Sequence, residues 1–433
     1  MTAATEPHAG PPDAPDAAPA AAPGEGPDPR RWPDVAARPR AAWPRTAIAA
    51  RLVRRALARL PLRAELPDGT RLGRGGPLLL LHEPDAFHRR IGADGLIGFG
   101  ESYLAGEWEA PDLVGVLTVL AENVRTLVPP SAQRLRAVWA RRQPGPHRNT
   151  PEGSRDNIHR HYDLSNDLFA LFLDPTMSYS SALFQSFPAQ PAHLAAAQHR
   201  KIDRMLDLAR VGPGTRLLEI GTGWGELAVR AAGRGAHVVS ATLSREQLAA
   251  ARERVHGAGQ SGRVELLLRD YRELTGRYDA VVSVEMIEAV GAEFWPDFFR
   301  TLDRRLRPGG RAALQAITMP HDRLLATVGT HTWIQKYIFP GGMLPSLRAM
   351  SRTAADHTSL RLERSEAFAP HYAETLRLWR EGFTARAPAV RALGFDETFL
   401  RMWTFYLAYS EAGFRSGYLD VRQLLLTKPE EAG

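Results

Sequence analysis

Apolar and polar positions in the second half of the chain switch regularly between a helical period and a strand period. The pattern predicts strands over 215–220, 236–242, 263–269, 278–284 and 311–317. Helices are predicted before and between them, over 194–209, 225–233, 244–257 and 292–306. Strands that alternate with helices are typical of an α/β fold with a mostly parallel, doubly wound sheet.

The N-terminal third has a different organisation. Residues 1–30 are a low-complexity run of Ala, Pro, Gly and Asp, which we expect to be disordered. Turn signals and short apolar runs follow, with a helical stretch over 113–127, and indicate a small α+β domain. We therefore divide the chain into a tail (1–30), an N-terminal domain (31–140), a linker (141–155) and a large domain (156–428).

A short basic helix is predicted between Arg45 and Leu60. Its apolar positions recur every fourth residue, and arginines fill the other side. The apolar positions are Ile48, Leu52, Ala56 and Leu60, and the arginines are Arg51, Arg54, Arg55 and Arg59. Such a helix either lies on an anionic membrane or packs on its own domain with a solvated arginine face.

The composition of the chain excludes several kinds of site and favours anionic partners. The 433 residues include no cysteine, which excludes disulfides, thiolate metal sites and a thiol nucleophile. No apolar run reaches the length of about 18 residues that a membrane-spanning helix needs, and no signal peptide is visible. The net charge of +7 favours anionic partners, although the preference for arginine over lysine also fits a general coding bias.

Residues 217–225 read Leu-Leu-Glu-Ile-Gly-Thr-Gly-Trp-Gly, an apolar strand followed by a glycine-spaced turn. The spacing differs from the dinucleotide fingerprint, and no Gly-Lys-Ser/Thr follows, so a phosphate-binding P-loop is excluded. The pattern resembles the S-adenosylmethionine (SAM) loop of class I methyltransferases. Ligands of doubly wound sheets lie beyond the carboxyl ends of the strands. Three further segments, 242–247, 270–271 and 285–288, fall at such ends.

Longer motifs make the resemblance more specific. Residues 157–184, Glu285 to Gly291, Tyr337 to Ser346 and His371 to Leu376 resemble the cyclopropane-fatty-acyl-phospholipid synthase family, which includes mycolic acid cyclopropane synthases. The resemblance covers about 155–427, and residues 95–108 are similar to the N-terminal domain of the full-length lipid enzymes. Segments 285–291, 314–320 and 333–337 are most similar to the actinobacterial branch associated with tuberculostearic acid. In that branch, a methyltransferase adds a methylene at carbon 10 of an oleoyl chain, and a separate reductase saturates it.

The resemblance implies which residues hold the cofactor. Two residues close over it, the glycine loop borders it, and the segment after the second strand lines its ribose and adenine. These residues are Tyr179 and Ser180, then Gly221, Gly223 and Gly225, then Thr242, Leu243 and Gln247.

Physical reasoning adds three candidates to the cofactor site. Many methyltransferases place an acid after the second strand for the ribose hydroxyls. Here that place holds Thr242, so Gln247 or Glu219 is expected to substitute. Asp270 is expected to accept a hydrogen bond from the adenine amino group, and Tyr271 to stack on the ring; an ordinary strand-to-loop turn is the alternative.

The chemistry of alkene methylation passes through a carbocation, which must be shielded from water and then lose a proton. Aromatic faces stabilise cations, and Tyr162 is the candidate for that role. The resemblance implies that a bound bicarbonate is the base, held by residues that match Glu288 and Tyr372. The family's Cys, His and His are replaced here by Ser181, Ala289 and Gln315. Because Ser and Gln still donate hydrogen bonds, we expect Ser181 and Gln315 to hold the bicarbonate in an altered site, and hypothesise that a shifted base favours the methylene product.

The sequence thus predicts a SAM-dependent methyltransferase that acts on oleoyl-type phospholipid chains and gives a 10-methylene product. The alternatives are a cyclopropane synthase, a small-molecule methyltransferase and a non-catalytic SAM- or lipid-binding protein. No metal is expected, and no nucleic acid, because an Asn/Asp-Pro-Pro-Tyr motif is missing. Expected partners are an anionic membrane surface, the reductase and a second copy in a homodimer. The predicted location is the cytoplasm, at the inner face of the membrane.

Overall fold

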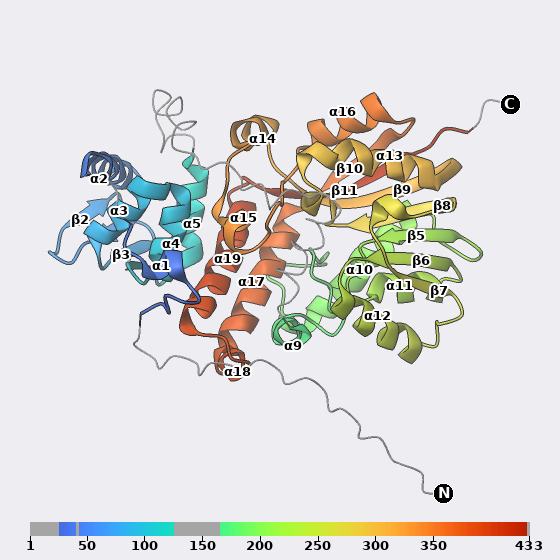
Figure 1. Cartoon of the computed structure of the whole chain (residues 1–433), viewed down its shortest axis with the longest axis horizontal. Coiled ribbons are helices and arrows are strands. Elements are labelled where there is room, and N and C mark those ends of the chain that lie inside the picture. The colour runs from blue at the N-terminus through green and yellow to red at the C-terminus, as the bar shows by residue number, and fades with distance from the viewer. Residues whose placement is uncertain (1–25, 40–42, 125–164, 431–433) are drawn as a thin grey trace, which may run out of the picture.

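The computed structural model describes residues 26–39, 43–124 and 165–430 (Figure 1). The tail up to residue 25, the predicted linker and Tyr162 lie outside these ranges. Figure 1 shows a small N-terminal part at one end of the molecule and a large α/β sheet at the other, with two long helices between them.

The large sheet has seven strands in the order β10-β11-β9-β8-β5-β6-β7. The strands are β5 (Arg216–Ile220), β6 (His237–Thr242), β7 (Val264–Leu268), β8 (Tyr278–Val284), β9 (Leu306–Thr318), β10 (Arg361–Ala367) and β11 (Asp420–Thr427). Strands β5 to β9 pair in parallel, whereas β11 pairs antiparallel with both β9 and β10. The predicted mostly parallel, doubly wound sheet is confirmed.

Successive residues of the central strands face two separate cores, as the period of two in a strand requires. Leu217 packs in a core with α10 (Leu194–Leu208) and α11 (Glu226–Gly233), whereas Leu218 packs on the opposite face with α13 (Trp295–Arg305) and α16 (Leu347–His357). The remaining helix of this region, α12 (Arg245–Gly257), contacts β6 and β7. Burial on both faces explains the near-continuous apolar runs that predicted these strands.

The N-terminal part is the predicted α+β unit. Its four-stranded sheet has the order β2-β1-β3-β4. The elements are α1 (Pro33–Ala36), α2 (Trp43–Leu57), β1 (Arg63–Glu65), β2 (Arg71–Gly73), β3 (Leu78–Leu81), α3 (Pro84–Asp94), α4 (Leu96–Leu104), β4 (Trp108–Glu109) and α5 (Leu113–Glu122).

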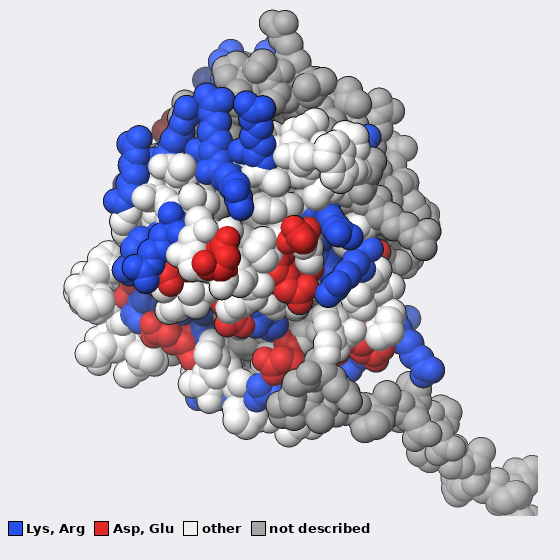
Figure 2. All heavy atoms as spheres, turned by 90° about the vertical axis from the view of Figure 1, so that its left-hand side faces the viewer, with Lys and Arg blue, Asp and Glu red and all other residues white. Residues whose placement is uncertain are grey.

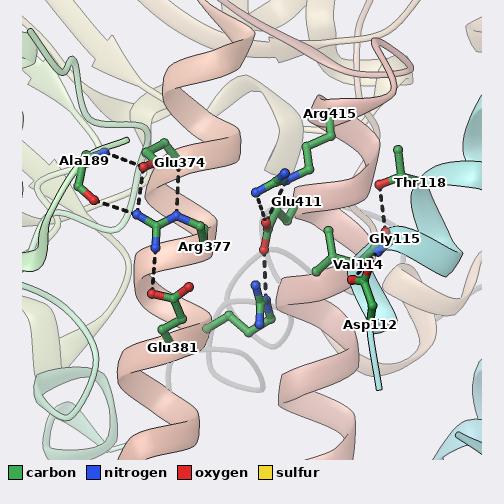
Figure 3. A network of polar contacts seen from close by, with 11 residues as sticks. Asp112, Val114, Gly115, Thr118, Ala189, Glu374, Arg377, Glu381, Glu411 and Arg415 are labelled. Atoms are coloured by element: carbon green, nitrogen blue, oxygen red, sulfur yellow. Dashed lines mark hydrogen bonds and ion pairs between the residues drawn. The ribbon is translucent and has the colours of Figure 1, made fainter. Parts of the chain in front are cut away.

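Two long helices, α17 (Ala369–Ala385) and α19 (Glu397–Arg415), join the two parts into one apolar core. Phe405 of α19 lies 6.4 Å, between ring centroids, from Trp108 of the N-terminal part. Glu411 of α19 is fully buried and forms ion pairs with Arg415 and with Arg380 of α17 (Figure 3). Both helices lie beyond residue 317, where no element was predicted from the sequence.

Shorter elements complete the large part: α9 (Asn166–Ala170), α14 (His321–Thr327), α15 (Trp333–Tyr337) and α18 (Ala387–Ala392). The described residues of this part also form four 3-10 turns, at Pro191–His193, Tyr271–Glu273, Ile287–Ala289 and Ala292–Phe294. None of the helices in the described ranges is both long enough and apolar enough to cross a bilayer.

Candidate active site

The glycine loop leads from β5 into α11 with a backbone that favours glycine. Gly221, Gly223 and Gly225 have φ values of +98°, +52° and +89°. A Cβ atom on Gly225 would lie 3.0 Å from the Cβ of Ala251, so the loop also needs glycine for close packing against α12. The loop therefore exposes backbone at the carboxyl end of the sheet.

A cavity of about 180 Å³ opens beside this loop. Most residues expected to hold the cofactor line it: Tyr179, Ser180, Glu219, Gly221, Gly223, Thr242, Leu243, Gln247 and Tyr271. Gly225 and Asp270 are absent from the lining. Lys201, Trp224 and Glu285 also line it, and the sequence analysis had not assigned them to the cofactor.

Polar groups on the cavity wall are fixed by one another. The hydroxyl of Ser240 donates to Glu219 at 2.6 Å, and the hydroxyl of Thr242 donates to the side-chain oxygen of Gln247 at 3.0 Å. Burial raises the pKa of Glu219 to about 8. A wall of polar side chains that includes a carboxyl group with a raised pKa suits the hydroxyl and amino groups of a nucleoside.

Tyr271 and Asp270 have different surroundings. The Tyr271 hydroxyl is buried and has no hydrogen-bond partner within the described ranges, as expected where a ligand group completes the contact. The Asp270 carboxylate accepts from the Arg272 guanidinium at 2.8 and 2.7 Å. Asp270 thus holds a strand-to-loop turn, which was the alternative to adenine binding, and it does not line the cavity.

Glu285, at the end of β8, is the centre of the site. Its carboxylate accepts three hydrogen bonds, from the Ser181 backbone N–H (2.9 Å), the Gln315 amide (2.8 Å) and the Tyr372 hydroxyl (2.6 Å). The oxygen of the Gln315 amide in turn accepts from Gln423 at 2.9 Å, which fixes the amide so that its N–H₂ faces Glu285. A carboxylate is therefore held rigidly at the edge of the cofactor cavity.

Glu288 and Tyr372, the two residues expected to hold a bicarbonate, do not share a partner in the structure, because the Tyr372 hydroxyl donates to Glu285. Glu288 instead accepts from the backbone N–H of Ile317 at 2.5 Å, and its second carboxylate oxygen is buried without a partner in the part of the chain described. Burial and the nearby charge of Glu285 raise the pKa of Glu288 to about 8. Glu288 is thus mostly protonated at neutral pH.

The residues present do not fit a bound bicarbonate. The three donors that would hold the anion are already on the Glu285 carboxylate, and a second anion there would meet that negative charge. The Ser181 hydroxyl donates to the Ala182 carbonyl, so Ser181 contributes only its backbone. One sequence signal pointed to Glu285, because an acid stands there directly after a predicted strand, on the ligand side of the sheet.

Tyr179 and Ser180 lie between the cavity and the helical part. The Tyr179 hydroxyl is 2.8 Å from that of Tyr406, and its ring stacks on Trp379 with 5.2 Å between centroids. The Lys201 ammonium donates to the Ser180 hydroxyl at 2.6 Å, and burial lowers the pKa of Lys201 to about 8. Within the described ranges, no group of three His, Asp or Glu residues is arranged to hold a metal ion.

This sheet, glycine loop and cavity define the class I SAM-dependent methyltransferases. Two solved structures are similar, each with a TM-score of 0.58 and 32% identity, covering 63% of this chain and 98% of theirs. They are the cyclopropane synthase MmaA2 from Mycobacterium tuberculosis and the mycolic acid cyclopropane synthase CmaA1 complexed with SAH and CTAB.

Sequence comparison narrows the class to a family. The family model for mycolic acid cyclopropane synthetase matches residues 149–424, and the chain belongs to this family. Tuberculostearic acid methyltransferase UfaA1 of Mycobacterium tuberculosis is 57% identical over 410 residues, 93% of this chain and 96% of the relative. Cyclopropane-fatty-acyl-phospholipid synthase of Escherichia coli K12 is 35% identical over 355 residues, 81% of this chain and 87% of the relative. The chain is therefore a SAM-dependent methyltransferase, and the predicted family and branch are confirmed.

Proposed function

We propose that the enzyme methylates the double bond of an oleoyl-type phospholipid chain and gives a 10-methylene acyl product, the precursor of tuberculostearic acid. The observation that carries this proposal is the Glu285 carboxylate, fixed by three donors at the edge of the cofactor cavity. The relative named tuberculostearic acid methyltransferase, similar over nearly the whole chain, supports the choice of substrate.

Cofactor binding is assigned to the cavity. The glycine loop, Glu219, Gln247 and Tyr271 would hold SAM, which supplies an electrophilic methyl group. The buried Tyr271 hydroxyl and the close approach allowed by Gly221 are the features that fit such a ligand. Tyr179 and Ser180 border the same cavity and would close over it.

The acyl chain then undergoes three balanced changes. Its π electrons would form a bond from carbon 10 to the methyl group as the methyl–sulfur bond breaks and its electron pair leaves with S-adenosylhomocysteine, which gives a cation at carbon 9. A 1,2-hydride shift from carbon 10 to carbon 9 moves the positive charge to the methyl-bearing carbon. Loss of a proton from the methyl group forms the exocyclic double bond.

Glu285 is our candidate for the base that takes this proton. A carboxylate is adequate because a carbocation is a very strong acid, and burial raises the pKa of Glu285 above its usual value. Tyr372, Gln315 and the Ser181 N–H hold it in position, and neutral Glu288 avoids a second negative charge beside it. We propose this carboxylate in place of the bicarbonate expected from the resemblance.

A cyclopropane is the second candidate product, because relatives named cyclopropane synthases share the fold. It would form if the methyl group lost its proton before the hydride shift, with closure of the ring. The two products have the same mass, so only a measurement of bonding separates them.

Partners follow from this chemistry as proposals. The substrate lies in a bilayer, so we propose a peripheral location at the inner membrane face, where lipid head groups are anionic. Conversion of the methylene to a methyl group needs a hydride and a proton, so we propose that a separate nicotinamide-dependent reductase acts next. We also propose that two copies of the chain form a homodimer.

The test is incubation of the protein with SAM and dioleoylphosphatidylglycerol vesicles, followed by mass spectrometry and proton NMR of the released fatty acids. We expect a gain of one CH₂ and signals of vinylidene protons. Upfield cyclopropane protons as the sole new signals would overturn the proposed product. Retention of SAM binding without turnover in the wild-type protein would instead identify a non-catalytic binder.

A further inference from the structure

Helix α2 presents large apolar side chains to solvent. Trp43, Ile48 and Leu52 are 82%, 48% and 39% exposed, although each would be expected in a core. The buried side of the helix is formed by other residues, chiefly Ala49 and Leu57.

The sequence pattern placed Ile48, Leu52, Ala56 and Leu60 on one apolar side, to face either a membrane or the rest of the domain, and the arginines on the other side. Leu60 is buried, but the helix turns so that Val53 and Leu57 pack against the N-terminal core. At about 100° per residue, Ile48 and Leu52 then share the outward side with the arginines.

Four arginines surround these exposed apolar groups. Arg51, Arg54, Arg55 and Arg59 are all exposed, and none forms an ion pair with an acid among the residues described. Figure 2 shows basic side chains gathered on this end of the molecule, over the N-terminal part, with acidic side chains below them. The outward side of α2 therefore combines unneutralised positive charge with exposed apolar surface.

We propose that the outward side of α2 docks the enzyme on an anionic phospholipid bilayer. Arginine heads pair with lipid phosphates while Ile48 and Leu52 enter the apolar boundary, as in amphipathic helices that lie in the interface. This inference rests on the proposed function, which makes the bilayer the source of the substrate.

A bilayer fits this surface better than a nucleic acid does. Both are anionic, and arginine alone does not separate them. A phosphate backbone offers no apolar layer for Ile48 and Leu52, whereas a bilayer does. The exposed aliphatic side chains thus decide between the two partners.

The test measures co-flotation of the full-length protein with vesicles of dioleoylphosphatidylglycerol and dioleoylphosphatidylcholine. We expect binding to phosphatidylglycerol vesicles that weakens with salt, and about 100-fold weaker binding for the Arg51→Gln/Arg55→Gln/Arg59→Gln variant. An Ile48→Ser/Leu52→Ser variant should bind several-fold more weakly even at low salt. Arg252→Gln/Arg361→Gln, which removes two exposed arginines from α12 and β10, should bind within two-fold of the wild type.

Wild-type affinity in the arginine variant would overturn the proposal, as would binding to duplex DNA or RNA in preference to vesicles. Turnover of the same lipid dispersed in detergent separates docking from chemistry. The arginine variant should retain wild-type turnover there and lose it only on vesicles. A third outcome is that neither the wild type nor any variant turns over the lipid, although flotation still depends on α2. The proposed function would then fail, and the docking surface would stand.

Discussion

Glu285 has a left-handed backbone, with φ at +50°. This conformation costs a residue with a Cβ about 1–2 kcal/mol, and the three hydrogen bonds to the carboxylate offset that cost. The strain directs the side chain toward Ser181, Gln315 and Tyr372 instead of along the strand. A strained, fully hydrogen-bonded acid beside a cofactor cavity is typical of a residue kept for chemistry.

Substitution of Glu285 tests the base directly. Glu285→Gln keeps the shape and removes the proton acceptor, so turnover should fall about 100-fold or more while SAM affinity, measured by calorimetry, stays within a few-fold. Unchanged turnover would exclude Glu285 as the base.

Glu285→Gly offers a second readout. Glycine relieves the strained backbone and leaves three unpaired donors around a small space, which suits a free carboxylate-like anion. We expect added bicarbonate to restore part of the activity of Glu285→Gly and to leave the wild type unaffected. Stimulation of the wild type by bicarbonate would return the family's bound anion to the mechanism.

The raised pKa of the Glu288 carboxyl group should make the stability of the folded protein depend on pH. Its pKa is raised to about 8 in the folded protein from 4.5 for the free group, so the folded state binds a proton that the unfolded chain releases between these values. Stability from this residue therefore falls as pH rises from about 4.5 to 8. In thermal scans without ligands, the melting temperature of Glu288→Gln minus that of the wild type should be larger at pH 8 than at pH 5. An equal difference at both pH values would contradict the raised pKa; Glu253→Gln, exposed on α12, is the control.

The residues of the cofactor cavity were largely predictable, whereas the base was not. Glycine spacing and strand ends depend on local sequence, so Gly221, Thr242 and Tyr271 were assigned to the region that the cavity occupies. Which of Glu285 and Glu288 meets Tyr372 depends on one backbone angle and on a helix almost ninety positions later. No local pattern carries that information.

At the scale of elements, periodicity located the strands and helices between 194 and 318 to within a few residues. The helices α17 and α19 escaped because they are buried on several sides, so their apolar residues do not form one stripe. Strand β10 lies at the sheet edge, where its exposed, charged residues give no strand signal. Tertiary burial, rather than local preference, determines these elements.

Alanine substitutions at two glycines, Gly100 and Gly233, test how closely α4 packs against α15. A Cβ on Gly100 of α4 would overlap the indole of Trp333 in α15, so Gly100→Ala should destabilise the protein by about 1–3 kcal/mol. Gly233, at the end of α11, has nothing within 4 Å of the added atom, and Gly233→Ala should be neutral or stabilise by up to about 1 kcal/mol. Urea unfolding monitored by circular dichroism gives both values. Equal effects would show that α4 and α15 do not pack as described.

At the scale of the whole molecule, a polar junction joins the N-terminal part to α15. Glu101 of α4 is buried and accepts from Lys336 at 2.5 Å and from the Tyr337 hydroxyl at 2.8 Å. Lys336 also pairs with Asp34 at 2.7 Å. Because the apolar core continues across the same boundary, we expect the two parts to unfold together.

The junction can be tested by a double-mutant cycle. Glu101→Gln removes the charge that Lys336 and Tyr337 share, and should cost about 3 kcal/mol because it leaves a largely buried ammonium without its main partner. Lys336→Met should cost a similar amount, and the double variant should cost less than the two together. Asp356→Asn, which breaks an exposed pair with Arg352, should cost less than about 1 kcal/mol. If the losses at Glu101 and Lys336 were additive, the N-terminal part would be held by apolar contacts alone. If the wild type showed two separate unfolding transitions, the N-terminal part would fold as an independent unit.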